Sequence, residues 1–249
     1  MIVYPNAKIN LGLNVLRKRE DGYHDISSVF YPVKECVDIL EIIKSERFQF
    51  TKSGIEIPDG ENICEKAWKL LDTDFGIGNV KIHLHKQIPI GAGLGGGSAD
   101  ASFTLKYLTE LFDLNLNNKE LEKYALRLGA DCPFFIDNTP KLVEGIGEKM
   151  TSIDLDLSNY EIRLVNPDIH ISTKESYSGI VPKTPVLSVE KIIELPIIEW
   201  KGKLKNDFEE SIFEKHLQLE GIKDELYKQG SIYSSMSGSG SIVFGIFEK

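Results

Sequence analysis

Cysteine is scarce in this sequence, and long apolar runs are missing altogether. The 249 residues include three cysteines, Cys36, Cys64 and Cys132, and no two of them have the C-x-x-C spacing. This usage indicates neither a disulfide framework nor a zinc site and favours a reducing compartment. No apolar stretch approaches the roughly 18 to 20 residues that span a membrane, and no basic-then-apolar signal opens the chain. We therefore expect a cytoplasmic protein that is neither exported nor membrane-spanning.

Positive charge is also in short supply. The sequence has 29 Lys and Arg residues against 38 Asp and Glu residues, which gives a formal net charge of -9. Nonspecific binding to nucleic acid or to an anionic membrane is therefore not expected. A phosphorylated ligand would have to be bound locally, by backbone N–H groups and a few well-placed cations. The contents of 41% hydrophobic and 27% charged residues are those of an ordinary globular protein.

Periodicity predicts a mixed protein of strands and helices. Short apolar runs between turn signals indicate antiparallel strands within residues 1–60. Strict alternation over residues 80–86 indicates a half-buried strand. Further strands are expected at 160–165 and 241–247, and helices at 62–71, 99–112, 117–128, 207–219 and 221–229. We place a lobe boundary near residues 148–158 and therefore expect two domains, 1–150 and 151–249.

A glycine-rich loop joins the strand at 80–86 to the helix at 99–112. Its sequence, Gly91-Ala-Gly-Leu-Gly-Gly-Gly-Ser98, lets backbone N–H groups approach an anion closely, and the following helix directs its positive end toward the same charge. A flexible connection is the alternative, but so many small residues are costly to order in a mere connector. The sequence therefore predicts a phosphate-binding loop from Gly91 to Ala101.

Better-known glycine motifs do not explain this loop. Gly91, Gly93 and Gly96 satisfy the G-x-G-x-x-G spacing, but the loop lies far from the N-terminus. The acidic residues that follow about 20 positions later belong to the same helix rather than to the end of a second strand. This placement argues against a dinucleotide-binding site. A Walker A loop requires a Gly-Lys-Ser/Thr sequence that is missing here.

A pair of histidines could suggest a metal site. His83 and His85 share one face of the predicted strand, a spacing that can chelate a metal ion. No carboxylate or cysteine nearby completes a ligand set, so we interpret both as polar residues on the solvent face.

The segment Pro89–Ser102 closely resembles the second motif of the GHMP kinases, the superfamily of galactokinase, homoserine kinase, mevalonate kinase and phosphomevalonate kinase. Pro5–Leu11 and Met236–Ser241 resemble the flanking motifs in the same order, so the resemblance spans nearly the whole chain. It implies an α+β, two-lobed GHMP kinase fold. The N-terminal lobe would be like domain 2 of ribosomal protein S5, and the C-terminal lobe would be ferredoxin-like.

Three details resemble the branch of this superfamily that phosphorylates 4-diphosphocytidyl-2-C-methyl-D-erythritol in the non-mevalonate isoprenoid pathway. They are Ala7-Lys8-Ile-Asn10, Asp21-Gly-Tyr-His24 and Gly129-Ala-Asp131-Cys-Pro133-Phe. The resemblance implies transfer of the γ-phosphate of ATP to the 2-hydroxyl group, giving ADP and the 2-phosphate, with Mg²⁺ as the metal. The partner would be a small molecule with a cytidine diphosphate group, and the chain would be a monomer or a weak homodimer.

The same resemblance implies catalytic roles. Asp131 would accept the hydroxyl proton, while Lys8 would keep Asp131 ionised and stabilise negative charge. By themselves, most Asp and Lys residues are exposed and nonfunctional. Lys8, however, lies in an otherwise apolar run, where an ammonium group needs a partner or a pocket. Asn10 shares its strand face and would bind the substrate or fix the lysine.

Aromatic residues would bind the cytosine. On the resemblance, Tyr23 would stack on the ring, His24 would read its hydrogen-bonding edge and Tyr177 would cover the other face. A packed turn aromatic and a capped surface histidine are the alternatives for Tyr23 and His24.

The glycine loop and the start of its helix would bind the nucleotide. The residues concerned are Gly91, Ala92, Gly93, Leu94, Gly95, Gly96, Gly97, Ser98, Ala99, Asp100 and Ala101. Ser98 could also touch the magnesium ion, whose other ligands are left open. Asn62 resembles an adenine-pocket position, but it could equally be an N-cap. Residues 237–240 would close around the phosphate or substrate, or form a tight turn.

Two rival functions stay open. Another kinase of the superfamily, acting on homoserine or a mevalonate derivative, would share the loop but should lack a paired Tyr-His for a pyrimidine. A nucleotide-binding regulator that has lost catalysis is the second rival, and the presence of Lys8 and Asp131 favours an enzyme over it.

Overall fold

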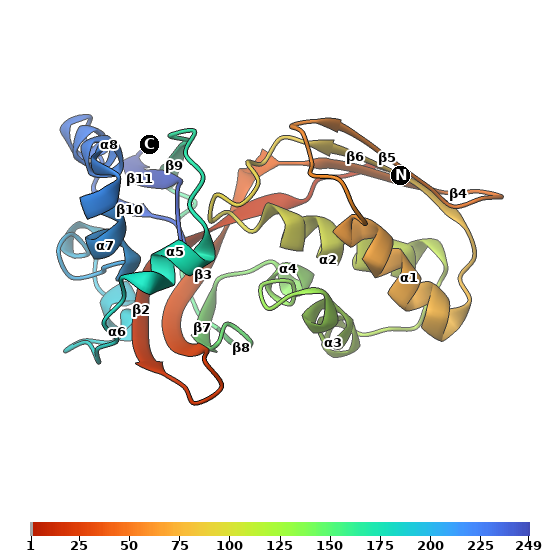
Figure 1. Cartoon of the computed structure of the whole chain (residues 1–249), viewed down its shortest axis with the longest axis horizontal. Helices are drawn as coiled ribbons and strands as arrows, with labels where there is room; N and C mark the ends of the chain where they lie inside the picture. The colour runs from red at the N-terminus through yellow and green to blue at the C-terminus, as the bar shows by residue number, and fades with distance from the viewer. Residues whose placement is uncertain (1) are drawn as a thin grey trace. The chain divides into compact units, whose positions relative to one another are not determined.

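The computed structural model describes residues 2–249 (Figure 1). Its contacts divide the chain into two compact units whose segments interleave along the sequence. Unit 1 comprises residues 2–8, 32–90 and 95–139, and unit 2 comprises residues 9–31, 91–94 and 140–249. The expected domains, 1–150 and 151–249, stay a prediction.

Unit 1 contains a four-stranded sheet in the order β1-β4-β6-β5. The strands are β1 (Ile2–Val3), β4 (Ile39–Lys44), β5 (Gln49–Gly54) and β6 (Val80–Lys86). The prediction of β6 is confirmed over its full length. Antiparallel strands were predicted within residues 1–60, and β4 does pair antiparallel with β6. The prediction is wrong for β5, which pairs with β6 in parallel. The helix between β5 and β6 allows this pairing, since parallel neighbours need a long crossover.

Four helices lie on one side of this sheet (Figure 1). They are α1 (Ile63–Phe75), α2 (Gly96–Leu111), α3 (Asn118–Leu128) and α4 (Phe134–Asp137). Their apolar faces bury a single core against the strands, in which Leu71 and Leu105 of the helices pack with Ile82 of the sheet. This core fixes the position of the N-terminus of α2, where the glycine loop ends.

The ends of α1 and α3 follow from their capping residues. Asn62 and Asn117 each form a capping box, with Glu65 and Glu120 three residues on. The predicted N-cap of α3 is therefore confirmed. Helix α1 runs beyond the predicted end at residue 71 and stops at Gly76, whose φ of 62° is readily adopted by glycine.

Unit 2 contains an antiparallel sheet in the order β10-β11-β9. Its strands are β9 (Tyr160–Val165), β10 (Tyr233–Met236) and β11 (Val243–Glu248). A second sheet has the order β2-β3-β7-β8, with β2 (Asn6–Lys18), β3 (His24–Val37), β7 (Lys141–Gly145) and β8 (Lys149–Ser152). The chain crosses from one unit to the other within β2, after Lys8, and within β3, after Tyr31.

Five short helical segments complete unit 2. They are α5 (Thr173–Ser178), α6 (Val189–Ile193), the 3-10 turn η1 (Ile197–Glu199), α7 (Phe208–Lys215) and α8 (Leu217–Lys228). The predicted break between the last two helices, near Gly221, is wrong. The chain leaves the helical conformation at His216, and Leu219 is fully buried in the core of unit 2. Packing of that side chain outweighs the helix-breaking tendency of glycine.

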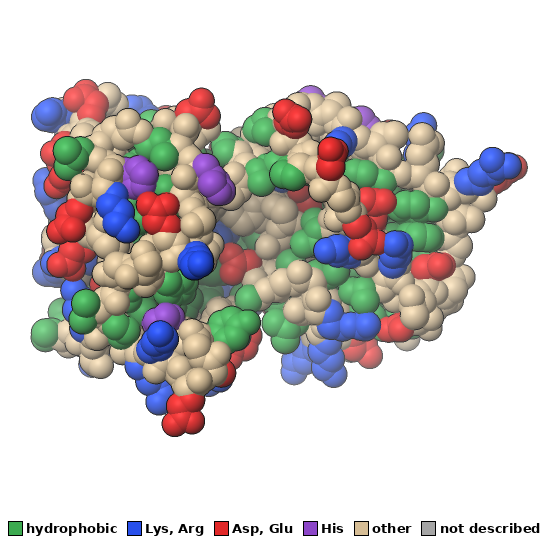
Figure 2. Space-filling view, viewed as in Figure 1, with side chains coloured by type: hydrophobic (Ala, Val, Ile, Leu, Met, Phe, Trp, Pro, Cys, Tyr) green, Lys and Arg blue, Asp and Glu red, His purple; other side chains and the backbone are tan. Residues whose placement is uncertain are grey.

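The surface fits the composition. Acidic and basic side chains are interspersed over the face shown in Figure 2. Within residues 2–249, none of the helices has the length and apolar character needed to cross a bilayer.

Candidate active site

The two predicted catalytic residues lie together in unit 1. Lys8 projects from β2, and Asp131 lies in the turn between α3 and α4. Lys8 Nζ is 3.7 Å from Asp131 Oδ2, with the lysine side chain 4% exposed and the aspartate 35% exposed. Burial lowers the pKa of Lys8, and the charge of Asp131 opposes that shift. The geometry thus places a partly exposed carboxylate beside a buried ammonium group.

The glycine loop passes directly over Lys8. Gly95 has a φ of 70°, and a β-carbon at this position would lie 3.2 Å from Lys8 Cε and 3.1 Å from Phe135 Cζ. A β-carbon on Gly96 would lie 2.8 Å from Ile88 Cγ2. Only glycine allows the loop to come this close. Around Gly97 a β-carbon would meet nothing within 4 Å, and this residue is exposed. The first turn of α2 therefore has open space where an anion could approach its N–H groups.

A buried ion cluster lies under the same loop. Lys86 Nζ is 2.5 Å from Asp38 Oδ2 and 2.7 Å from Asp100 Oδ2, and all three side chains are at most 4% exposed. Asp38 also accepts hydrogen bonds from Gln87 N and Ile88 N. Burial raises the pKa of Asp100 to about 8, against the opposing effect of Lys86. This cluster anchors α2 to β6 just behind the glycine loop.

Sequence reasoning missed Lys86, although a signal was present. The period-two pattern that puts Val80, Ile82 and Leu84 on the buried face of β6 also puts Lys86 there. A lysine at such a position needs carboxylate partners.

Four of the predicted nucleotide-binding residues, Gly96 among them, are buried in α2. Ala99, Asp100 and Ala101 are at most 2% exposed, and Asp100 binds Lys86. Ser98 is half-buried. Burial raises the pKa of the nearby Cys132 thiol to about 11. A nucleotide-binding role for these residues stays a prediction.

Three sequence motifs meet at one hydroxyl group in unit 2. Ser237 Oγ donates a hydrogen bond to Gly93 O at 2.8 Å and accepts one from Asn10 N at 3.3 Å. Gly93 has a φ of 80°, and a β-carbon there would lie 2.0 Å from Ser237 O. The first half of the glycine loop is therefore packed against the last motif of the chain.

The side chain of Asn10 is held by a residue that the sequence did not indicate. Asn10 Nδ2 donates to Ser28 Oγ at 2.9 Å, and Ser28 Oγ donates to Gly12 O at 2.6 Å. Ser28 lies on β3, the long strand that periodicity missed. The expected pairing of Asn10 with Lys8 stays a prediction.

The predicted cytosine-binding residues come partly together. The rings of His24 and Tyr177 are stacked with centroids 4.8 Å apart at 26°, and Tyr177 meets Phe208 edge-on. Partial burial, helped by the nearby charge of Lys18, lowers the pKa of His24 and favours the neutral ring. Tyr23 is 61% exposed, so its ring is available to a ligand. Stacking of Tyr23 on a base stays a prediction.

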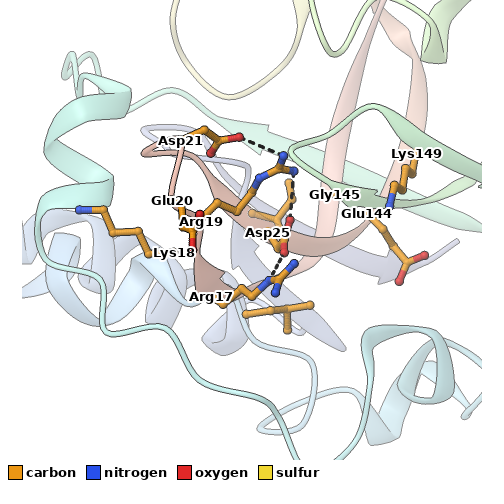
Figure 3. Close-up of a pocket in the computed structure, with 11 residues that line it drawn as sticks. Arg17, Lys18, Arg19, Glu20, Asp21, Asp25, Glu144, Gly145 and Lys149 are labelled. Atoms are coloured by element: carbon orange, nitrogen blue, oxygen red, sulfur yellow. Dashed lines mark hydrogen bonds and ion pairs between the residues drawn. The ribbon is translucent and has the colours of Figure 1, made fainter.

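The turn that carries Tyr23 is braced by ion pairs. Asp25 pairs with both Arg17 and Arg19, and Arg19 also pairs with Asp21 at 2.9 Å (Figure 3). Arg19 N donates to Tyr23 O, which closes the turn. The four paired charged residues line an open pocket of about 810 Å³, together with Glu144 and Lys149 of the β7–β8 hairpin. Its charges are balanced in sign.

Two other predictions concern side chains of unit 1. His83 and His85 lie half-buried on the face of β6 opposite the core, which is the solvent face as predicted, and both hydrogen-bond the hydroxyl of Ser53 on the parallel strand β5. Asn62 caps α1, since its Oδ1 accepts from Cys64 N at 2.9 Å. Among residues 2–249, no group of three or more His, Cys, Asp or Glu side chains is placed to hold a metal ion.

Comparisons with known proteins agree with this geometry. Residues 62–138 match the family model described as GHMP kinases N terminal domain, and residues 194–249 match the one described as GHMP kinases C terminal. A 4-diphosphocytidyl-2-C-methyl-D-erythritol kinase of Parabacteroides distasonis is 51% identical over 251 residues, 100% of this chain and 92% of its own length. The chain belongs to the GHMP kinases. It is therefore a small-molecule phosphotransferase of a family that uses ATP as phosphate donor, and the expected α+β GHMP kinase fold is confirmed.

Two further relatives carry the same name, and a third shares the fold alone. A 4-diphosphocytidyl-2-C-methyl-D-erythritol kinase of Bacteroides thetaiotaomicron is 50% identical to this GHMP kinase and covers 100% of the chain and 92% of its own length. A crystal structure of 4-(cytidine 5'-diphospho)-2C-methyl-D-erythritol kinase superposes with a TM-score of 0.85 at 32% identity, covering 99% of this chain and 90% of the other. A homoserine kinase from Cytophaga hutchinsonii, at 16% identity and a TM-score of 0.71 over 98% and 85%, shares the fold.

Substitution of Asn62 separates its two interpretations. Asn62→Ala should lower the free energy of unfolding by about 1 kcal/mol, since the cap is lost. Asn62→Asp keeps the carbonyl-type acceptor for Cys64 N but loses the amide donor, so it should retain stability. If the amide binds adenine, Asn62→Asp will raise the KM for ATP. Unchanged ATP kinetics in a stable Asn62→Asp variant would leave Asn62 as a cap only.

Substitutions in the buried ion cluster should lower the free energy of unfolding by unequal amounts. Lys86→Ala leaves two buried carboxyl groups without their cation and should cost about 3–5 kcal/mol in denaturant unfolding. Asp100→Asn should cost less, because most Asp100 carboxyl groups hold a proton near neutral pH when the pKa is about 8. Lys81→Ala, on the exposed face of β6, is the control.

The same cluster predicts a pH dependence. The pKa of Asp100 is raised from 3.8 to about 8 on folding, so the folded protein holds the extra proton between these values. Wild-type stability should therefore fall relative to Asp100→Asn as the pH rises through this window. Urea unfolding at several pH values measures the difference, and a parallel pH dependence of the two proteins would contradict the assignment.

Proposed function

We propose that this GHMP kinase transfers the γ-phosphate of ATP to the 2-hydroxyl group of 4-diphosphocytidyl-2-C-methyl-D-erythritol. The single observation that carries the substrate is the 51% identity with a kinase of that name over 100% of this chain. The stacked pair of His24 and Tyr177, beside the exposed ring of Tyr23, supports a site for an aromatic base. The products would be ADP and the 2-phosphate. The reaction would take place in the cytoplasm, as one step in the synthesis of isoprenoid precursors.

Asp131 is the residue that would receive the proton. The 2-hydroxyl oxygen forms a bond to the γ-phosphorus while the bond from that phosphorus to the β–γ bridging oxygen breaks, and ADP leaves. The hydroxyl proton passes to Asp131 and then to solvent. Asp131 is 35% exposed and therefore accessible to an alcohol, and its Oδ2 lies 3.7 Å from Lys8 Nζ.

The first turn of α2 would bind the terminal phosphates. Its N–H groups carry the positive end of the helix dipole, and the space around Gly97 is open. The ammonium group of Lys8, under Gly95, would stabilise negative charge on the transferred group. These contributions act mainly by alignment and charge, as phosphoryl transfer requires.

The donor set suits a magnesium ion that arrives with the nucleotide. Mg²⁺ in kinase sites keeps several waters and takes few ligands from the protein, while phosphate oxygens supply others. The half-buried hydroxyl of Ser98, at the start of α2, would be such a ligand. When bound, the ion would neutralise charge on the phosphates.

The chain would act as a monomer or a weak homodimer.

Ligand protection tests the substrate assignment. A ligand that binds the folded chain raises its melting temperature. Cytidine diphosphate compounds should therefore protect the protein, while homoserine and mevalonate should not. Coupled ADP release should then occur with diphosphocytidyl-methylerythritol and not with a panel of other alcohols. Protection by homoserine or mevalonate, with no effect of cytidine nucleotides, would identify a different member of the family.

Removal of the Asp131 carboxylate should separate binding from turnover. Asp131→Ala should bind ATP nearly normally but lose turnover by about 10²–10⁴-fold, because the base contacts the acceptor rather than the nucleotide. Initial rates and ATP titration measure the two effects. Asp224→Ala, an exposed position on α8, is the matched control. Near-normal turnover of Asp131→Ala would remove this residue from the mechanism.

Loss of the Tyr23 ring should change the KM for the cytidylyl substrate more than the KM for ATP. Tyr23→Ala should raise the KM for the cytidylyl substrate more than the KM for ATP, since stacking on the base is lost. Tyr4→Ala, at a tyrosine that is 57% exposed, controls for loss of a surface ring. Equal changes in both KM values would contradict a cytosine contact.

A further inference from the structure

The last motif of the chain is held by a buried amide outside all three family motifs. Asn206, 3% exposed, lies in the segment before α7. Its Nδ2 donates to Met236 O and to Gly238 O, both at 2.8 Å, and its Oδ1 accepts from Phe208 N at 3.0 Å. One side chain thus fixes the carbonyl groups on both sides of Ser237.

The backbone of the same segment is joined to the first motif's strand. Asn206 forms an isolated parallel bridge with Leu13 of β2. Leu13 N donates to Lys205 O at 2.9 Å, and Asp207 N donates to Leu13 O at 2.8 Å. Asp207 Oδ2 also accepts from Val15 N at 2.8 Å. Asn206 therefore ties the strand that carries Asn10 to the loop that carries Ser237.

The carbonyl groups that Asn206 binds determine where the Ser237 hydroxyl lies. Gly238 has a φ of 57°, and a β-carbon there would lie 3.2 Å from Asn10 Oδ1, so the turn packs closely against the first motif. Ser237 Oγ in turn donates to Gly93 O. A chain of contacts thus runs from the Asn206 amide through Ser237 to the glycine loop, within unit 2.

We propose that Asn206 is a positioning residue for phosphoryl transfer, which holds the Ser237 hydroxyl, and through it Gly93, in the geometry that the reaction uses. This role rests on the proposed function, because its kinetic test is the kcat of that phosphoryl transfer. Because Asn206 is only 3% exposed, it would act through Ser237 rather than on a ligand. Its requirement is for a side chain that donates twice and accepts once, which among residues of this size only asparagine provides.

Replacement by aspartate tests the donor requirement. Asn206→Asp keeps the shape and the acceptor for Phe208 N, but turns an oxygen toward two carbonyl oxygens. We expect kcat to fall by about 10²-fold, because small displacements of aligned groups have costs of this order. The thermal midpoint should fall as well, because a buried carboxylate would face two carbonyl oxygens, so kcat is measured well below that midpoint. Asp207→Asn, which keeps an acceptor for Val15 N one residue away, is the matched control and should retain kcat.

A double-mutant cycle separates positioning from general destabilisation. If Asn206 acts through the serine hydroxyl, Asn206→Asp combined with Ser237→Ala should lose little more kcat than the larger single loss. Fully additive losses, or a wild-type kcat in Asn206→Asp, would overturn the proposal. If Asn206→Asp does not fold, Asn206→Ala, which adds no charge, replaces it in the same cycle.

Hydrogen exchange of the free protein gives a readout that needs no substrate. Ser237 N is bonded to Ile242 O, and Ile242 N to Ala92 O. Exchange of these two amides should become faster in Asn206→Asp and stay unchanged in Asp207→Asn. Faster exchange in a chain that does not phosphorylate the cytidylyl alcohol would refute the proposed function and keep the positioning role. Unchanged exchange would refute the positioning role, whatever the substrate.

Discussion

The burial of one ammonium group is the constraint on which the proposed active site depends. Lys8 sits in a strand whose neighbours are apolar, and its charge is tolerated there because Asp131 lies 3.7 Å away. The same lysine requires glycine at position 95, since a β-carbon would crowd its Cε at 3.2 Å. The position of the loop, the pairing of the carboxylate with the ammonium group and the positive charge available to a phosphate all follow from this arrangement.

The family motifs are divided between the two compact units in a regular way. The first motif supplies Lys8 to unit 1 and Asn10 to unit 2, and the glycine loop passes from unit 2 to unit 1 between Leu94 and Gly95. Each half has its own support. In unit 1 the Lys86 cluster anchors α2, and in unit 2 the Ser237 hydroxyl holds Gly93. One short motif can therefore contribute side chains to both units, because the chain passes from one unit to the other within the motif.

Local signals predicted most elements of the core of unit 1, and longer-range packing explains the misses. Asn117 and the alternation of β6 were decisive because they encode a cap and a buried face within a few residues. The parallel pairing of β5, the strand β3 and the helix break at His216 depend on partners distant in sequence. Lys8 and Asp131 could be predicted from the family motifs, whereas Asn206 carries no local signal, since its partners lie 30 and 32 residues on.

Binding of an ATP analogue in a crystal is the most direct measurement of the central claim. The account predicts that the terminal phosphates lie within hydrogen-bonding distance of the backbone N–H groups at Gly96, Gly97 and Ser98, with the Lys8 ammonium group and the Asp131 carboxylate facing the γ-phosphate. A nucleotide bound elsewhere, or phosphates remote from Lys8 and Asp131, would contradict it.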